Sequence, residues 1–344
     1  MEKEQNPYLS VPIEKIDPAH DAFCLRYGRQ EDEALKESIA SLGIRTPLLL
    51  LGEEDKLTIL SGFARYHSAV ACAKKELHAR ILNGPLSTRD HYELLKNLIK
   101  ENMEDRGLNP MEQAMALEKA SAWLQASDLD REDAVKRVTT EVMPLIGRKP
   151  LRQMYERLIA WLELGPLTRQ ALAIGQIPEN AADALGELPT PDQDRLCDSM
   201  VRYRMSTGMC RDFSRMAYEV CKRDKINAED LLLRLNHDDS QSPENPADYR
   251  KELLERLRRL RYPILSRQEA RFEELHRRLA LPDGIRLIPP THFEGDRFRL
   301  EAQLRGKSDF VKMVENISKT LNDKNDTIDA IFRICTEIEE APES

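Results

Sequence analysis

A carboxylate and an amide stand side by side in the stretch LIKENMEDRGLNPMEQAMAL, residues 98–117. The pattern predicts a helix that runs through Glu101 and Asn102 and breaks at Gly107. A second helix is expected after the Asn-Pro step at 109–110, because asparagine can cap a helix and proline fits the first helical position. The Glu-Asn pair is either plain polar surface or a pair of ligands, and the residues alone leave both interpretations open.

Positive side chains gather further along the chain, at the start of another predicted helix. The stretch 141–164 predicts a helix, a tight turn at Gly147 and a second helix. This is the helix-turn-helix layout, whose second helix can enter the major groove of DNA. Its predicted DNA-contacting residues are Arg148, Lys149, Arg152 and Arg157. Many helical hairpins share this pattern, so ordinary helical packing is the alternative.

Composition restricts the class of protein. The 344 residues are enough for two or three domains, and 41% hydrophobic with 33% charged residues predicts a folded chain with a highly charged surface. The sequence contains neither an apolar run of about 20 residues nor a signal peptide, so we expect a cytoplasmic protein that does not enter a membrane. Six scattered cysteines without a Cys-x-x-Cys pair are expected to be reduced thiols.

Charge is distributed unevenly along the chain. The formal net charge of −8 argues against a uniformly basic surface for nucleic acid. The middle of the chain is nevertheless locally basic, and the tail from residue 322 is acidic. A local basic face therefore remains compatible with the composition.

The first 87 residues predict a small α/β domain, because strand and helix signals alternate with glycine at the turns. The first helix is expected to end at Gly43, a typical position for a helix-ending glycine. Short strands are expected at 11–18, 46–51, 56–60 and 77–82, and helices at 32–42 and 63–75.

The remainder of the chain predicts two further domains and a linker. Residues 88–235 have helical periodicity almost throughout, and the polar stretch 236–249 is the expected linker. Residues 250–344 predict a helix, two short strands, another helix and the acidic tail. This helix–strand–strand–helix unit is short, so we expect it to be stable when paired with a second copy.

The order of these segments resembles the ParB family of DNA-segregation proteins. The resemblance is carried by LKESIASLGIRTPLLLL (35–51), LTILSGFARYHSAVA (57–71) and KENMEDRGLNPMEQAMAL (100–117), then by the helix-turn-helix and GQIPENAADAL (175–185). It runs from about Val11 to about Leu321.

The resemblance implies an α+β, mainly helical fold. Its parts would be a small α/β ParB/sulfiredoxin-like N-terminal domain, an all-helical middle domain with the helix-turn-helix, and a small α-β-β-α C-terminal dimerisation domain. The implied partners are DNA, a second copy of the chain and a ParA-type ATPase, and the implied location is the nucleoid.

Members of the ParB family hold CTP and a magnesium ion with the first three segments, so the resemblance implies such a site here. Glu101 would bind Mg²⁺ as a hard oxygen ligand, and Asn102 would donate to phosphate. Gly62 would let backbone amides approach phosphate, and Arg65 would pair with phosphate oxygens. The full implied set is Gly43, Ile44, Pro47, Gly62, Arg65, His67, Glu101 and Asn102.

The chain departs from the family pattern at several of these positions. Phe63 and Ala64 replace an acidic residue and an arginine, and Asp105 stands where an arginine is expected, with Arg106 one place later. Losing charged hydrogen bonds should weaken nucleotide binding by roughly 1.5–3 kcal/mol each. In the segment 180–183 the family's histidine and arginine are absent, and an aspartate that faces DNA there would be repelled.

Two classes of function remain open. The leading hypothesis is a dimeric ParB-like DNA-binding protein in plasmid or chromosome partition or in transcriptional regulation, with CTP acting as a clamp switch. The alternative is a nucleotide-dependent enzyme on the same fold, either a CTPase or a small-molecule kinase. A third option is a partner-binding adaptor without either site.

Overall fold

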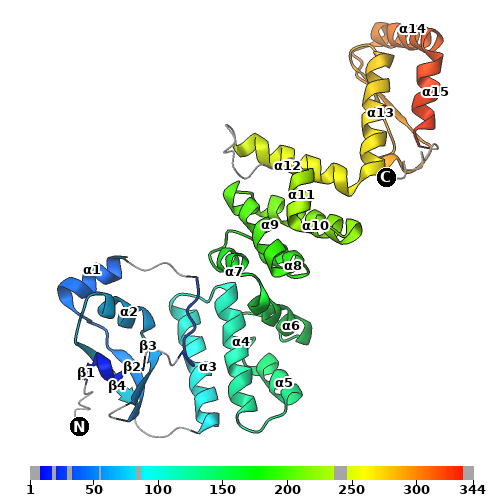
Figure 1. Cartoon of the computed structure of the whole chain (residues 1–344). Helices are drawn as coiled ribbons and strands as arrows, with labels where there is room; N and C mark the ends of the chain where they lie inside the picture. Colours follow the sequence, from blue (N-terminus) through cyan, green and yellow to red (C-terminus); the bar gives the residue numbers. More distant parts are fainter. Residues whose placement is uncertain are drawn as a thin grey trace. The chain divides into compact units, whose positions relative to one another are not determined.

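The computed structural model describes residues 8–17, 21–28, 33–53, 56–82, 87–235 and 246–335. The chain divides into two compact units, 1–233 and 234–344 (Figure 1), which are described separately. The predicted domain limit at residue 87 lies inside the first unit, and this division stays a prediction. Among the described residues, no helix combines the length and apolar character needed to cross a membrane.

A four-stranded sheet forms the first part of unit one. Its strands are β1 (Leu9–Pro12), β2 (Leu48–Glu53), β3 (Lys56–Ser61) and β4 (Glu76–Leu82). They lie in the order β1-β4-β2-β3, with β2 parallel to β4 and the other pairs antiparallel. The 3-10 turn η1 (Ile13–Lys15) follows β1, and the helices of this part are α1 (Glu33–Leu42) and α2 (Phe63–Ala71).

The sheet is held by an apolar core that includes Leu48, Leu50, Leu57 and Ile59. Along β4 the residues alternate, with Leu77 and others facing the core and their neighbours exposed. This period of two is what a strand with one buried face requires. The predicted alternation of strands and helices is therefore present, within the first unit.

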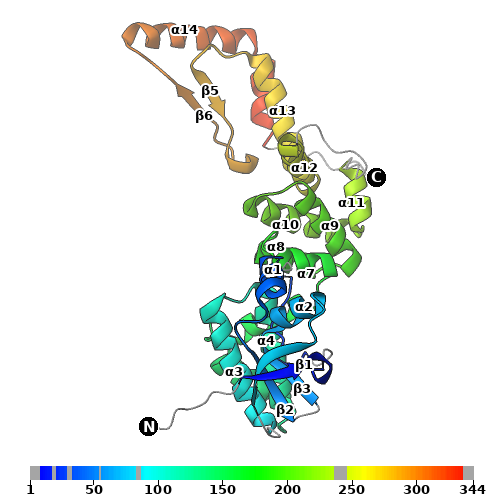
Figure 2. The ribbon, with the colours of Figure 1, turned by 90° about the vertical axis from the view of Figure 1, so that its left-hand side faces the viewer.

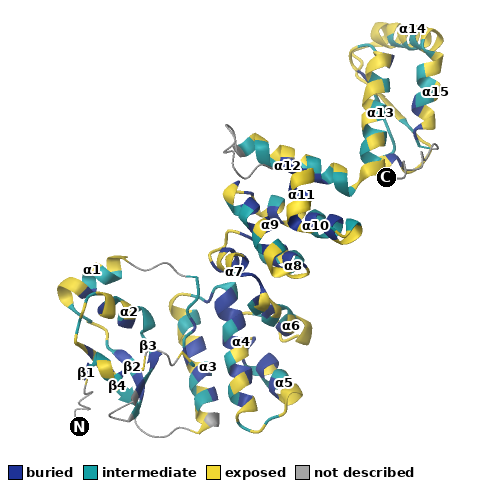
Figure 3. Ribbon diagram, in the orientation of Figure 1, coloured by how far each residue is buried: buried dark blue, intermediate teal, exposed yellow. Residues whose placement is uncertain are grey.

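Helices make up the remainder of unit one. They are α3 (Thr88–Asp105), α4 (Pro110–Gln125), α5 (Arg131–Glu141), α6 (Arg152–Ala160), the 3-10 turn η2 (Trp161–Glu163), α7 (Pro166–Ala173), α8 (Glu179–Gly186), α9 (Thr190–Arg202), α10 (Thr207–Asp224) and α11 (Ala228–Arg234). Helix α4 packs against α3, α5, α6 and α7. Most of its residues are buried, as the dark blue of Figure 3 shows. It is the central helix of this part.

Two helices joined by a turn lie at the predicted helix-turn-helix, but their limits differ from 141–164. Residues 142–147 form turns, so the first helix is α5, which ends at Glu141, and the second is α6. Pro144 explains the difference, because proline lacks the amide hydrogen that a continuing helix needs. The chain reverses at Gly147, whose φ of +72° suits glycine.

Unit two contains α12 (Pro246–Arg261), α13 (Pro263–Leu279), β5 (Ile285–Ile288), the 3-10 turn η3 (Thr291–Phe293), β6 (Arg299–Ala302), α14 (Lys307–Asp323) and α15 (Asn325–Arg333). Strands β5 and β6 form an antiparallel hairpin, and α13 packs against α15; Figure 2 shows the hairpin with α13 and α14. Helix α14 has no buried residue.

The prediction for the linker was partly wrong. Residues 236–245 lie outside the described residues, whereas 246–249 belong to α12. Pro246 begins this helix, and proline suits the first turn because its missing amide hydrogen has no partner there in any case. Overall, the mainly helical α+β fold and the helix–strand–strand–helix order are confirmed.

Candidate nucleotide and DNA sites

The junction of α3 and α4 forms as the sequence predicted. Helix α3 ends at Asp105, and Gly107 has the positive φ of +69° that lets the chain turn. Asn109 caps α4: its side chain accepts from the backbone N–H of Glu112, whose carboxylate in turn accepts from the Asn109 N–H. This reciprocal capping box fixes the direction in which α4 leaves the junction.

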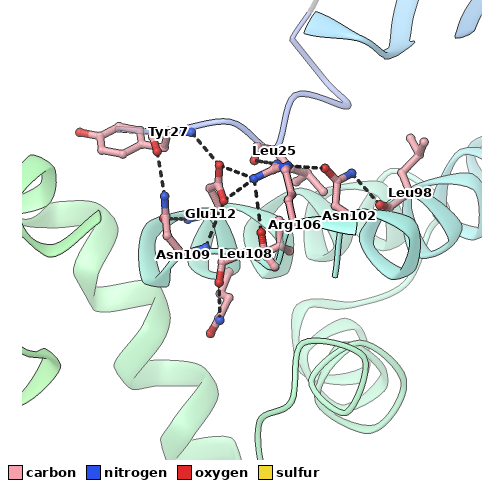
Figure 4. A network of polar contacts seen from close by, with 10 residues as sticks. Leu25, Tyr27, Leu98, Asn102, Arg106, Leu108, Asn109 and Glu112 are labelled. Carbon is pink, nitrogen blue, oxygen red and sulfur yellow. Dashed lines mark hydrogen bonds and ion pairs between the residues drawn. The ribbon is translucent and has the colours of Figure 1, made fainter. Parts of the chain in front are cut away.

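Arg106 occupies the centre of the junction (Figure 4). Its Nη1 donates to both oxygens of Glu112, at 3.0 and 2.8 Å, and its Nη2 donates to the carbonyl of Leu25 at 3.1 Å. The Glu112 side chain is completely buried. A buried carboxylate needs such a partner, since an unpaired buried charge is strongly unfavourable. Arg106 therefore stabilises the junction.

The segment of residues 25–27 crosses the same junction. The backbone N–H of Tyr27 donates to Glu112 at 3.4 Å, and Asn109 Nδ2 donates to the Tyr27 carbonyl at 2.9 Å. Glu112 and Asn109 thus join the start of α4 to a segment more than 80 residues earlier in the chain.

The side chain of Asn102 is used within the helix. Its Nδ2 donates to the carbonyl of Leu98 at 2.7 Å, and its Oδ1 accepts from Arg106 Nε at 2.9 Å. Glu101 beside it is exposed. Among the described residues, no group of three His, Cys, Asp or Glu side chains could hold a metal ion. The roles predicted for Glu101 and Asn102 stay predictions.

Three other predicted nucleotide-site residues come together at the start of α2. Arg65 Nη1 donates to the carbonyls of Thr46 and Pro47, at 2.6 and 2.7 Å. A Cβ added to Gly62 would lie 3.2 Å from the Arg65 guanidinium carbon, so the arginine lies against the glycine backbone. Gly62 is the N-cap of α2 with φ of +105°, and no side chain caps the helix. Burial lowers the pKa of Arg65.

The remaining predicted residues of this set have other surroundings. Gly43 ends α1 with φ of +72°, and its N–H donates to the Ile39 carbonyl. Ile44 is partly buried against the sheet core. His67 is exposed, and its ring lies edge-on to that of Tyr66 at 5.4 Å between centroids. These three residues make contacts within the protein itself, and their predicted nucleotide-binding roles stay predictions.

Two of the four predicted DNA-contacting cations are paired with acids on α8. Arg148 donates to both oxygens of Glu179, at 2.5 and 3.2 Å. Arg157 Nε lies 2.9 Å from one oxygen of Asp183, and its Nη2 lies 3.3 Å from Glu179. The structure therefore places Arg157 of α6, and Arg148 in the segment before α6, against acids of α8.

Asp183, which would be repelled if it faced DNA, has two side-chain partners in the structure, and its effect on DNA stays a prediction. Its carboxylate accepts from Arg157 and from the indole N–H of Trp161 at 2.8 Å. Sequence reasoning missed this role because Asp183 follows Arg157 by 26 residues, and no local pattern joins them. It also missed Glu112, although the spacing Asn109-x-x-Glu112 is a capping-box signature.

The other two cations lie on the surface. Lys149 is exposed, and 63% of the Arg152 side chain is exposed although it pairs with Glu156 and Glu132. Hydrogen bonds to these acids raise the pKa of Arg152. Such exposed pairs are weak and screened by salt, so Arg152 is available to other anions.

Comparison with known proteins gives two curated relatives, while no family model matches the chain. A probable chromosome-partitioning protein ParB of Campylobacter jejuni is 24% identical over 203 residues, 59% of this chain. The chromosome-partitioning protein Spo0J of Thermus thermophilus is 26% identical over 188 residues, 55% of this chain. The chain is similar to these chromosome-partitioning proteins over more than half of its length.

These matches span just under two thirds of the relatives' own length, 66% and 62%. Two solved structures of a C-terminally truncated ParB from Caulobacter crescentus, one with the centromeric parS site and one with CTP-gamma-S, are also similar. Their identities to this chain are 17% and 20%, and their TM-scores 0.32 and 0.24. They cover 60% and 57% of this chain and 98% and 99% of their own. Because both superpositions are loose, the likeness to the ParB family rests on the sequence matches.

Proposed function

We propose that this chain is a divergent ParB family member that binds duplex DNA through α5 and α6 and acts in plasmid or chromosome partition or in transcriptional regulation. The exposed basic start of α6 is the observation that carries the proposal. Lys149 and Arg152 lie there next to exposed Gln153, at the helix end that enters the major groove in helix-turn-helix proteins. Association with the nucleoid follows from such binding.

Fluorescence anisotropy with labelled duplexes tests this proposal. Because lysine and arginine contacts to phosphate release counterions, affinity should fall as salt rises. A random duplex gives the non-specific affinity, and selection from a random pool gives any preferred site. Absence of binding to every duplex at low salt would exclude the proposal.

We also propose that unit two joins two copies of the chain. On α14 the apolar residues Phe310, Val314 and Leu321 are 52%, 48% and 46% exposed, and their spacing places them on one helix face. Leu300 in β6 is similarly exposed. An exposed apolar helix face of this kind is typical of a protein–protein interface. A C2 dimer would cover the same face on both copies.

A nucleotide site for CTP with Mg²⁺ is a further part of the proposal. The start of α2 offers backbone N–H groups without a capping side chain, and Arg65 is fixed beside them by two carbonyls. Helix N-termini favour anions such as phosphate. Glu101 would be the carboxylate ligand of magnesium, which usually takes only one or two from the protein.

Calorimetry with CTP, ATP and GTP in the presence of magnesium, with and without DNA, tests the nucleotide site. A heat of binding measured with CTP for wild type, and lost in the Arg65→Ala variant, would support the nucleotide site. The enzyme alternative would be supported by release of phosphate from the nucleotide. Both curated relatives are named as partitioning proteins, which favours the DNA-binding proposal over this alternative. Pull-down with a ParA-type ATPase tests the remaining expected partner.

A further inference from the structure

The acids of α8 lie against the cations of the helix-turn-helix. Glu179, at the start of α8, contacts both Arg148 and Arg157, and Asp183 one turn later contacts Arg157. The side chains in these pairs are only 20–35% exposed, so salt screens them less than it screens the exposed pairs of Arg152.

Geometry makes these pairs stronger than ordinary surface pairs. Arg148 meets Glu179 with two nitrogens, and Arg157 meets Asp183 through Nε and Nη2, so both contacts use the planar fork of the guanidinium. Additional bonds fix each partner: Arg148 Nε donates to Gln113 at 2.7 Å, and Trp161 donates to Asp183. The Arg157 guanidinium also lies 5.2 Å from the centre of the Trp161 ring.

The arrangement has an electrostatic consequence for DNA binding. Two acids neutralise two of the four cations near the second helix, and any phosphate that contacts Arg148 or Arg157 must compete with a fixed carboxylate. The exposed cations Lys149 and Arg152 are not restrained in this way. The ion pairs therefore weaken phosphate contacts by Arg148 and Arg157 more than they weaken contacts by Lys149 and Arg152 at the exposed helix start.

We propose that Glu179 and Asp183 are specificity-determining residues: they hold Arg148 and Arg157 away from the phosphate backbone and so suppress non-specific binding to DNA. This inference rests on the proposed DNA binding. In this proposal α8 affects which DNA is bound through its ion pairs with Arg148 and Arg157, and no residue of α8 needs to contact a base.

The test uses the full-length chain with Glu179→Gln, Asp183→Asn and the double variant. Both changes keep the shape of the side chain, and asparagine can still accept the Trp161 hydrogen bond. Glu187→Gln is the matched control, because Glu187 lines a cleft of about 330 Å³ together with Arg157 and Asp183 but does not take part in these ion pairs. It removes the same charge as each single variant.

Anisotropy with a random duplex is measured over a range of salt concentrations. For the double variant we expect about tenfold tighter binding at low salt, and a salt slope steeper by about 0.9 for each arginine that gains a phosphate. Thermal unfolding of each variant accompanies the measurement. Loss of structure would weaken binding, so tighter binding with a steeper slope cannot arise from unfolding.

Each outcome is decisive. Wild-type binding with the same affinity and slope in the double variant and in Glu187→Gln would overturn the inference and leave the proposed function intact. Tighter binding with a steeper salt slope in the double variant, and wild-type affinity and slope in Glu187→Gln, would support it. Absence of binding by every form would overturn the proposed function and the inference together.

Discussion

Arg106 Nη1 lies 3.0 and 2.8 Å from the two carboxylate oxygens of Glu112, whose side chain is completely buried. This ion pair joins the end of α3 to the first turn of α4. It also answers what the polar residues at this junction do: Asn102 orients Arg106, and Arg106 compensates the buried charge. The family pattern has an arginine at the position of Asp105. In this chain the arginine is Arg106, one residue later, and it pairs with Glu112.

Removal of Arg106 should destabilise the protein strongly. Arg106→Ala leaves the buried Glu112 carboxylate without its cation, which costs about 3–5 kcal/mol in unfolding free energy. Urea unfolding followed by tryptophan fluorescence measures it, since both tryptophans of the chain, Trp123 and Trp161, lie in the helical part of unit one.

Asp105→Asn is the matched control for Arg106→Ala. Asp105 is exposed at the last position of α3, where a negative charge opposes the helix dipole, so its removal should change stability by less than about 0.5 kcal/mol. An Arg106→Ala protein as stable as this control would contradict the structural role of the ion pair.

Glu141 should make the stability depend on pH. Partial burial acts to raise its pKa, but hydrogen bonds from Lys96 and Arg137 outweigh burial and lower the pKa below 4.5. The ionised carboxylate therefore stabilises the fold above pH 4.5, and the contribution is lost as the pH falls through the lowered value. Tyr92 also donates to Glu141 at 3.1 Å, and burial raises the pKa of this tyrosine.

Comparison of wild type with Glu141→Gln at several pH values measures this effect. The variant should be less stable near neutral pH, and the difference should shrink as the pH drops below the ordinary glutamate value of 4.5. Glu104→Gln, an exposed change on α3, serves as the control. An equal difference at neutral and acidic pH would show that the Glu141 charge does not contribute.

The exposed cations at the start of α6 should each contribute to DNA affinity. Lys149→Ala and Arg152→Ala should weaken binding to all duplexes if they contact phosphate, and each should reduce the salt slope by about 1. Lys36→Ala on α1 changes the same charge in the sheet-containing part and should have little effect. Equal affinities for all three variants and wild type would place the DNA contacts elsewhere.

Local features of the sequence predicted the elements well, because their causes are local. The Asn-Pro step at 109–110 began α4, Gly43 ended α1, and Pro263 separated α12 from α13. The limits of the helix-turn-helix were less accurate because Pro144 and its buried neighbours replace one helical turn with a loop.

The contacts of the candidate sites were not predictable in the same way. Asp183 meets Arg157 only because α8 packs beside α6, and Glu112 meets the backbone of Tyr27 across 85 residues. Charge type predicted which side chains could bind anions, but tertiary packing determined which of them are already paired.

Helix α14 provides the last prediction, the disruption of a dimer. Phe310, Val314 and Leu321 share one face of this helix, and all three are exposed in a single chain. Phe310→Glu with Val314→Glu would place two charges in the apolar interface, where burying an unpaired charge costs several kcal/mol. The double variant should therefore become monomeric.

Light scattering after size exclusion measures this change, with 39.6 kDa as the mass of one chain. Wild type should have twice that mass and the double variant the single value. Lys312→Glu is the control, since Lys312 is exposed on a different face of the helix and its reversal should leave the dimer intact. A wild-type protein that stays at 39.6 kDa at high concentration would exclude the proposed dimer, because the apolar face would then lack a second copy to cover it.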